Sequence, residues 1–142
     1  MTQIIRYLIL NSGFWIFAVM LDKVEASYSQ QVYFEKSFGG TGNDYARSVR
    51  QLSDGSIYVA GYSNGGTKGG FDFALNKLDR YGNLLWTQYY GDSLDNNGLY
   101  MNKTADGNFI FVGETQTDSN LLDIRLYKID TAGNSLWTKQ YG

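Results

Sequence analysis

The sequence predicts an all-β fold of the β-propeller type, and three observations support this prediction. Its 142 residues include 17 Gly and no Pro, and 16% are aromatic, a composition that favours short strands joined by tight turns. A segment of roughly fifty residues occurs twice, a period typical of repeat architectures. Each copy contains four strand-like runs separated by turn motifs. We therefore expect two blades of an incomplete propeller, each a four-stranded antiparallel meander.

The repeat is visible as identical residues at matching positions in the two copies. Asp54-Gly55 and Gly61 recur 52 residues later, at Asp106-Gly107 and Gly113, whereas the pairs that follow them in the sequence are 51 residues apart. The difference falls in the loop at residues 64–70, which matches 116–121, and loops tolerate such insertions. The remaining pairs singled out as structural repeat positions are Asp79/Asp130, Gly82/Gly133, Trp86/Trp137 and Tyr90/Tyr141.

Eight strands are expected, four in each copy. The second strand of each copy is apolar at consecutive positions, residues 57–60 and 109–112, which is typical of a strand covered on both faces. The third alternates apolar and polar residues until Leu78 or Ile129, where the change of parity indicates a β-bulge. The expected strands are residues 45–52, 56–62, 71–78, 84–90, 97–104, 108–114, 122–129 and 135–141.

Two kinds of turn separate these strands. Residues 54–55 and 106–107 are Asp-Gly pairs, which are typical of tight hairpins in which glycine takes a positive φ. Residues 79–82 and 130–133 are typical of type I turns closed by a left-handed glycine. In these turns the Asp carboxylate is expected to accept hydrogen bonds from backbone N–H groups two or three residues further on.

Residues 33–39 match the fourth strand of each copy but have no matching first three strands before them. We therefore expect a lone outer strand there, then blade one at about 45–91 and blade two at about 97–142. Propellers usually close with roughly four to eight blades. The chain is expected to be a fragment of a larger propeller, whose open faces recruit further repeats or a second copy.

The N-terminal residues 1–26 are typical of a secretory signal peptide. Arg6 precedes an apolar run at residues 7–21, and Val24-Glu25-Ala26 forms a small-x-small cleavage pattern. An uncleaved membrane anchor is the alternative, but at about 1.5 Å per residue this run falls short of a hydrocarbon core of about 30 Å. We expect a secreted protein, in the periplasm, at the cell surface or outside the cell, with a short lead-in at residues 27–32.

Composition also limits the chemistry open to the chain. It has no His and no Cys, so Ser-His-Asp and Cys-His nucleophile systems, disulfides and ordinary zinc sites are excluded. With 12 Lys+Arg against 14 Asp+Glu the net charge is −2, which provides no basic footprint for nucleic acid. We expect no enzyme activity, no catalytic residues and no cofactor.

Two motifs in each copy resemble a known family. One has the form D-G-x-[IF]-[IVY]-[VF]-x-G-x-[ST], and the other D-x-x-[LI]-x-K-[LI]-D-x-x-G-N-x-x-W. They occupy residues 54–63 and 106–115, and residues 72–86 and 123–137. Over residues 33–142 the chain thus resembles the secreted bacterial β-propeller repeat family, although Phe34 stands where Trp86 and Trp137 stand. The resemblance is specific for the fold and nearly silent about function. Together with the missing nucleophile systems, it leads us to expect a non-catalytic scaffold or binding module that is secreted or exposed at the cell surface.

Aromatic residues four positions apart recur in the fourth strands, and two interpretations of them are open. They could stack on a sugar, giving a carbohydrate-binding propeller, or they could pack between adjacent blades. Packing is favoured because the repeat reproduces the rings regardless of the surrounding loops. Asp72/Asp123 and Lys77/Lys128 recur in the same way and are expected to serve as inter-strand partners. The aromatic pairs are Phe34/Phe38, Trp86/Tyr90 and Trp137/Tyr141.

Two cofactor sites were weighed against this interpretation. The loops at residues 39–44 and 91–98 are rich in Asp and Asn oxygens suited to calcium, but Leu94 occupies a ligand position and no Glu follows at the required distance. A quinone-dehydrogenase-like propeller would place its Trp eight residues after the Asp of its docking motif. Here the Trp stands closer, seven residues after Asp79 and Asp130.

If residues 1–26 are a signal peptide, a compatible secretion system will release a mature protein that begins near Ser27. N-terminal sequencing and intact mass of the exported product measure this directly. A secreted product that retains residues 1–26 would contradict cleavage.

Overall fold

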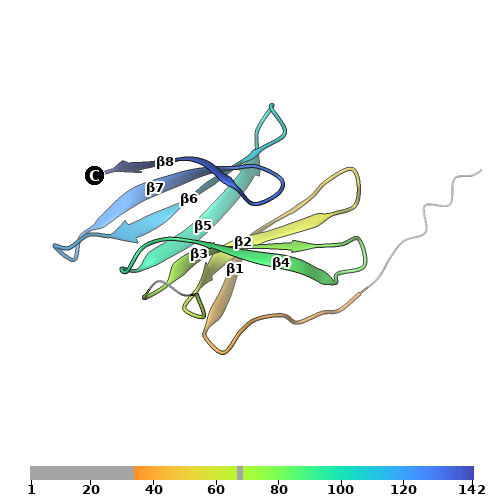
Figure 1. Cartoon of the computed structure of the whole chain (residues 1–142), viewed down its shortest axis with the longest axis horizontal. Coiled ribbons are helices and arrows are strands. Elements are labelled where there is room, and N and C mark those ends of the chain that lie inside the picture. Colours follow the sequence, from red (N-terminus) through yellow and green to blue (C-terminus); the bar gives the residue numbers. More distant parts are fainter. Residues whose placement is uncertain (1–33, 67–68) are drawn as a thin grey trace, which may run out of the picture. The chain divides into compact units, whose positions relative to one another are not determined.

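The computed structural model describes residues 34–66 and 69–142, and these residues form eight strands and no helix. They build two separate four-stranded antiparallel sheets, each in sequence order (Figure 1), which confirms the all-β fold of two blade-like meanders. The expected strand bounds are right to within two residues. The first sheet is β1 (Asp44–Gln51), β2 (Ile57–Ser63), β3 (Asp72–Leu78) and β4 (Leu84–Tyr90). The second is β5 (Asn96–Lys103), β6 (Phe109–Gln116), β7 (Leu122–Ile129) and β8 (Ser135–Tyr141). The expected signal peptide and lead-in lie outside the described residues.

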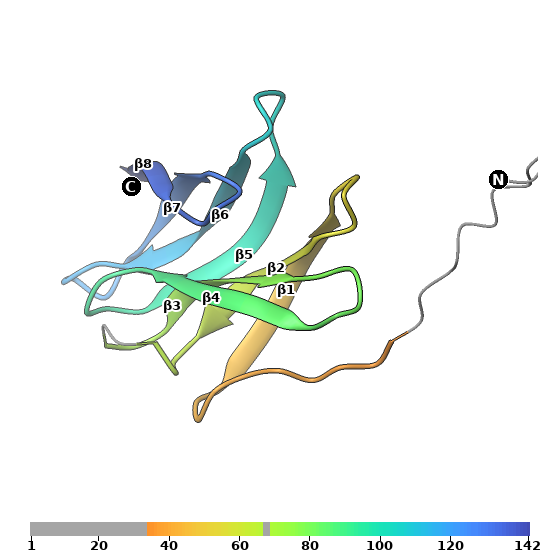
Figure 2. The ribbon, with the colours of Figure 1, turned by 45° about the vertical axis from the view of Figure 1, so that its right-hand side comes forward.

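One hydrophobic core joins the two sheets face to face (Figure 2). Aromatic rings from both sheets make the closest contacts: the centroids of Tyr58 and Phe109 are 4.7 Å apart, and those of Phe73 and Phe111 are 4.9 Å apart. Each such ring pair stabilises the fold by about 0.5–1.5 kcal/mol beyond the free energy gained by burying its apolar area. This packing is compatible with that of neighbouring propeller blades, in an arrangement that is not closed into a ring. The core residues are Tyr58, Ala60, Phe73, Leu75, Tyr90, Met101, Phe109, Phe111, Tyr127 and Ile129.

The expectation that β2 and β6 are covered on both faces is wrong. In β2, Tyr58 and Ala60 are buried, whereas Ile57 and Val59 are only half-buried. In β6 Phe109 and Phe111 are buried and Ile110 and Val112 are half-buried, so β6 buries the face opposite to the one that β2 buries. Each central strand would need a blade on both sides, and here each sheet is covered by one neighbour.

The two Asp-Gly hairpins and the two type I turns form with the expected glycine conformations. Gly55 has φ +88° and donates to the carbonyl of Leu52, and Gly82 has φ +79° and donates to that of Asp79. The carboxylate of Asp79 accepts from the N–H groups of residues 81 and 83, two and four positions on rather than two or three. The side-chain hydrogen bond from Asn83 is the main cause of the lowered pKa of Asp79.

The expected irregularities at Leu78 and Ile129 are present as register shifts, but the extra residues are Leu85 in β4 and Leu136 in β8 and do not lie in the third strands. Two further bulges, between residues 46 and 48 in β1 and between 98 and 100 in β5, were not expected. They explain why Gly61 and its counterpart recur. A Cβ on Gly61 would overlap the Tyr45 carbonyl oxygen of the bulged strand, and a Cβ on Gly113 would overlap that of Asn97.

Replacing Trp86 by Ala should lower the free energy of unfolding by about 3 kcal/mol, because Trp86 is half-buried against the core and contacts Tyr58 edge-on. Trp137→Ala should cost about 1 kcal/mol or less, since that side chain is 40% exposed. Urea unfolding of both variants measures the difference. Equal losses would show that the two blades bury their tryptophans alike.

Candidate functional site

The aromatic pair of β4 packs against the last turn of the second sheet. A Cβ on Gly133 would lie 3.1 Å from Cη2 of Trp86. The hydroxyl of Tyr90 donates to the Gly133 carbonyl at 2.7 Å, and burial raises the pKa of Tyr90. Three recurring residues therefore meet across the boundary between the blades. A Cβ there would crowd the indole, and the positive φ of Gly133, +91°, also favours glycine.

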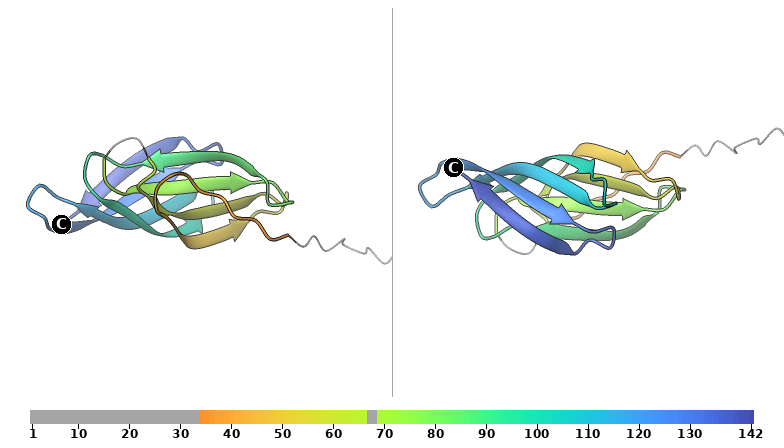
Figure 3. Two further views of the ribbon diagram at one scale, coloured as in Figure 1. Left: turned by 90° about the horizontal axis from the view of Figure 1, so that it is seen from below. Right: turned by 90° about the horizontal axis from the view of Figure 1, so that it is seen from above.

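The segment at residues 34–40 repeats half of this arrangement on the first sheet. A Cβ on Gly82 would overlap the ring of Phe34, so Phe34 stands to Gly82 as Trp86 stands to Gly133. The segment forms no β-ladder, however, and the expected lone outer strand is wrong for residues 34–39. An outer strand pairs with the third strand of its own blade, and the described residues provide none for it. In the view from below, the segment at residues 34–40 crosses the face of the first sheet (Figure 3, left).

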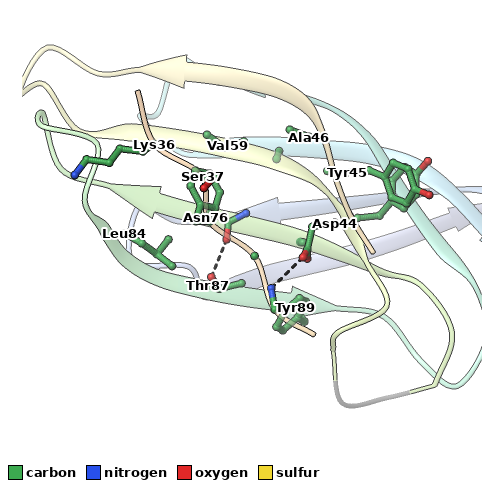
Figure 4. Close-up of a pocket in the computed structure, with 17 residues that line it drawn as sticks. Lys36, Ser37, Asp44, Tyr45, Ala46, Val59, Asn76, Leu84, Thr87 and Tyr89 are labelled. Carbon is green, nitrogen blue, oxygen red and sulfur yellow. Dashed lines mark hydrogen bonds between the residues drawn. The ribbon is translucent and has the colours of Figure 1, made fainter. Parts of the chain in front are cut away.

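A pocket of about 390 Å³ lies between this segment and the outer face of the first sheet (Figure 4). Lys36 and Ser37 line one side, and Val59, Asn76 and Thr87 line the other. The Thr87 hydroxyl donates to the Asn76 side-chain oxygen at 2.7 Å, so these two polar groups satisfy each other. The wall offers an apolar surface with a few polar atoms, as ligand pockets usually do.

Larger residues stand at the corresponding places of the second sheet. Phe111 matches Val59, and Tyr127 matches Asn76, and both aromatic side chains are buried against the first sheet. The pocket therefore exists because the first sheet carries smaller side chains and because a single extended segment covers it.

An aromatic cluster at the end of the first sheet was missed by the sequence analysis. Tyr45 and Tyr62 stack with their centroids 4.7 Å apart, and Phe71 meets Tyr62 edge-on. The Arg47 guanidinium lies 5.2 Å from the centroid of the Tyr62 ring and donates a hydrogen bond to the Tyr62 hydroxyl at 2.7 Å. The second copy has other residues at these positions, so a search for repeated residues passes over them.

A polar network occupies the loop at residues 91–98, where calcium was considered. Arg125 donates to the Asp92 carboxylate at 2.7 Å and to the Asn96 side-chain oxygen at 2.9 Å. Thr115 donates to the same Asn96 oxygen at 2.6 Å. Burial of Asp92 opposes its ionisation, but hydrogen bonds from Asn96 and Arg125 outweigh it and hold its pKa below the ordinary value. A cation of the protein itself therefore neutralises this carboxylate, and the described residues include no cluster of three or more metal-ligating side chains.

The other recurring residues are placed differently in the two blades. Asp79 and Asp130 hold their turns, each accepting from an Asn side chain four residues on at 2.8 Å. Trp137 and Tyr141 lie on the open face of the second sheet and are exposed. The structure thus brings together one aromatic pair with its glycine and leaves the matching pair uncovered.

No protein-family model matches this chain, and no curated protein matches it. The resemblance to secreted bacterial β-propeller repeats therefore stays a prediction. In the part of the chain that the structure describes, no helix is long and apolar enough to cross a membrane.

The network around Asp92 should stabilise the fold in a pH-dependent way. In the folded protein the pKa of Asp92 lies below the unfolded value of about 3.9. The stabilisation is therefore fully present above about pH 3.9 and is lost as the pH falls through the folded pKa of Asp92. Asp92→Asn should therefore lose less stability than the wild type between about pH 7 and about pH 3. Urea unfolding at the two pH values tests this, with the exposed Asp118→Asn as control. Equal acid losses in wild type and Asp92→Asn would contradict it.

Proposed function

We propose that this chain is a non-catalytic, exported β-propeller scaffold that works by presenting blade faces and loops to other molecules. The observation that carries the proposal is the use of recurring residues in packing: Trp86 and Tyr90 of one blade meet Gly133 of the next. The repeat preserves the boundary between blades and does not preserve a set of reactive groups. With no His or Cys in the sequence, the familiar nucleophile systems are closed to it.

The charged repeat positions support the same proposal. Asp79 and Asp130 are engaged by backbone N–H groups of their own turns. Lys128 donates to the Thr104 hydroxyl at 3.0 Å and pairs with Asp106 at 2.8 Å. These side chains hold strands and turns in place, which leaves the surfaces of the blades as the parts that meet partners.

A carbohydrate-binding module is the second candidate, and one observation favours it. Trp137 and Tyr141 are exposed on one sheet face, and the Lys139 ammonium lies 5.8 Å from the Trp137 ring centroid. Exposed rings with a polar neighbour can stack on a sugar and hydrogen-bond to it. An exposed apolar patch of this kind marks an interaction site, whether its partner is a glycan or a protein.

A glycan array probed with the exported protein and its Trp137→Ala variant separates the two candidates. The scaffold proposal expects the two proteins to give the same signal, because the rings are protein-contact residues. Tyr81→Ala removes an exposed ring from a turn on the first sheet and serves as the matched control. Saturable glycan binding that is lost in Trp137→Ala and kept in Tyr81→Ala would overturn the scaffold proposal.

A further inference from the structure

We infer that the open face of β5–β8 is a docking surface for a second copy of this chain, which seats the outer face of its own β1–β4 there in head-to-tail fashion. The inference rests on the proposed scaffold function and names its partner. Its basis is the interface inside the chain, which shows how one blade face of this kind is covered by the next blade.

The open face of the second sheet repeats the buried face of the first. Ile124 is 53% exposed where its counterpart Phe73 is fully buried, and Tyr141 is 55% exposed where Tyr90 is 8% exposed. These positions differ in burial because the first sheet has a neighbour on that side. The apolar members of the open face are Ile110, Val112, Ile124, Leu126, Trp137 and Tyr141.

The complementary surface is the outer face of the first sheet. Val49 is 57% exposed there, whereas its counterpart Met101 is fully buried against the first sheet. Ile57 and Val59 lie beside it and are half-buried. Asn76 and Thr87 are polar members of this face, and the Thr87 hydroxyl donates to the Asn76 side-chain oxygen, so that oxygen can be covered without being left unpaired.

The turn at Gly82 supplies a specific seat for this docking. Within the chain, Trp86 lies over Gly133 and the Tyr90 hydroxyl bonds to the Gly133 carbonyl. By the same geometry, Trp137 of one copy lies over Gly82 of the next. The hydroxyl of Tyr141 then has the Gly82 carbonyl as its acceptor.

Phe34 already occupies that seat, so the segment at residues 34–40 competes with the incoming copy. It holds its place without a β-ladder, and Phe34 itself is 43% exposed. A phenylalanine also lacks the hydroxyl and the larger ring that the Trp-Tyr pair brings. Docking therefore displaces residues 34–40 from the first sheet and covers that face with β5–β8 of the second copy instead.

Such an interface joins two different surfaces, so a head-to-tail dimer keeps one free surface of each kind. Interfaces of this sort form rings when the rotation closes and open chains when it does not. Two blades per copy make roughly two to four copies sufficient for a ring of the usual size.

Sedimentation velocity of the full chain tests the inference over a roughly hundredfold range of concentration, since association follows mass action. The wild type should associate. Val49→Lys and Trp137→Ala should each weaken association about tenfold or more, as expected for an interface anchor. Phe34→Ala should strengthen association by freeing the seat at Gly82. Leu121→Ala removes an exposed apolar side chain from a turn and should change nothing.

A mixture of the two weakened variants provides the sharper result. Val49→Lys keeps the open face of β5–β8, and Trp137→Ala keeps the outer face of β1–β4, so together they should form a dimer that neither forms alone. Association that both substitutions leave unchanged, or that Trp137→Ala weakens and Val49→Lys does not, would overturn head-to-tail docking. So would a monomer at every concentration in both the wild type and Phe34→Ala.

The same variants separate this inference from the proposed function. Val49 lies away from the exposed rings of β8, so Val49→Lys should leave any glycan signal unchanged. Association that depends on both residues, together with Trp137-dependent glycan binding, would contradict the scaffold function and leave the docking standing. A monomer without glycan binding would contradict the docking alone.

Discussion

The contact between an outer-strand aromatic pair and the glycine turn of the next blade is the interaction on which the described structure depends. The turn that Trp86 and Tyr90 meet holds Gly133 at φ +91°, and a Cβ on that residue would crowd the indole. The hydrogen bond from the Tyr90 hydroxyl to the Gly133 carbonyl links β4 to the turn before β8. Core rings such as Phe73 and Phe111 then fill the space between the sheets, and their close packing stabilises the pair.

The same contact explains the asymmetry between the two blades. The first sheet has its buried face against the second and a single segment over its other face. The second sheet has one covered face and one open face. Residues that are equivalent by sequence therefore have different surroundings, as Tyr90 and Tyr141 show. An apolar residue at a repeat position is a core residue only where a neighbouring blade lies over it.

The pocket and the open face follow from this asymmetry rather than from special sequence motifs. Val59 and Asn76 are small compared with their counterparts Phe111 and Tyr127, and the cover at residues 34–40 does not fill the space above them. A blade seated there would remove the pocket. Ligand binding in the pocket and docking of a blade would therefore exclude each other at the outer face of the first sheet.

Local sequence determined the strands, the turns and the order of the meanders. Alternation, the Asp-Gly pairs and the glycines at positions 82 and 133 act through backbone conformation over a few residues, which a sequence shows directly. Tertiary structure decided the rest, because burial depends on which sheet faces which. It packed Trp86 half-buried against the core and left Trp137 exposed. It also set Phe34 against Gly82 without a β-ladder and placed bulges opposite Gly61 and Gly113. Residues far apart in the chain meet only after the sheets pack, so the repeat alone could not assign their roles.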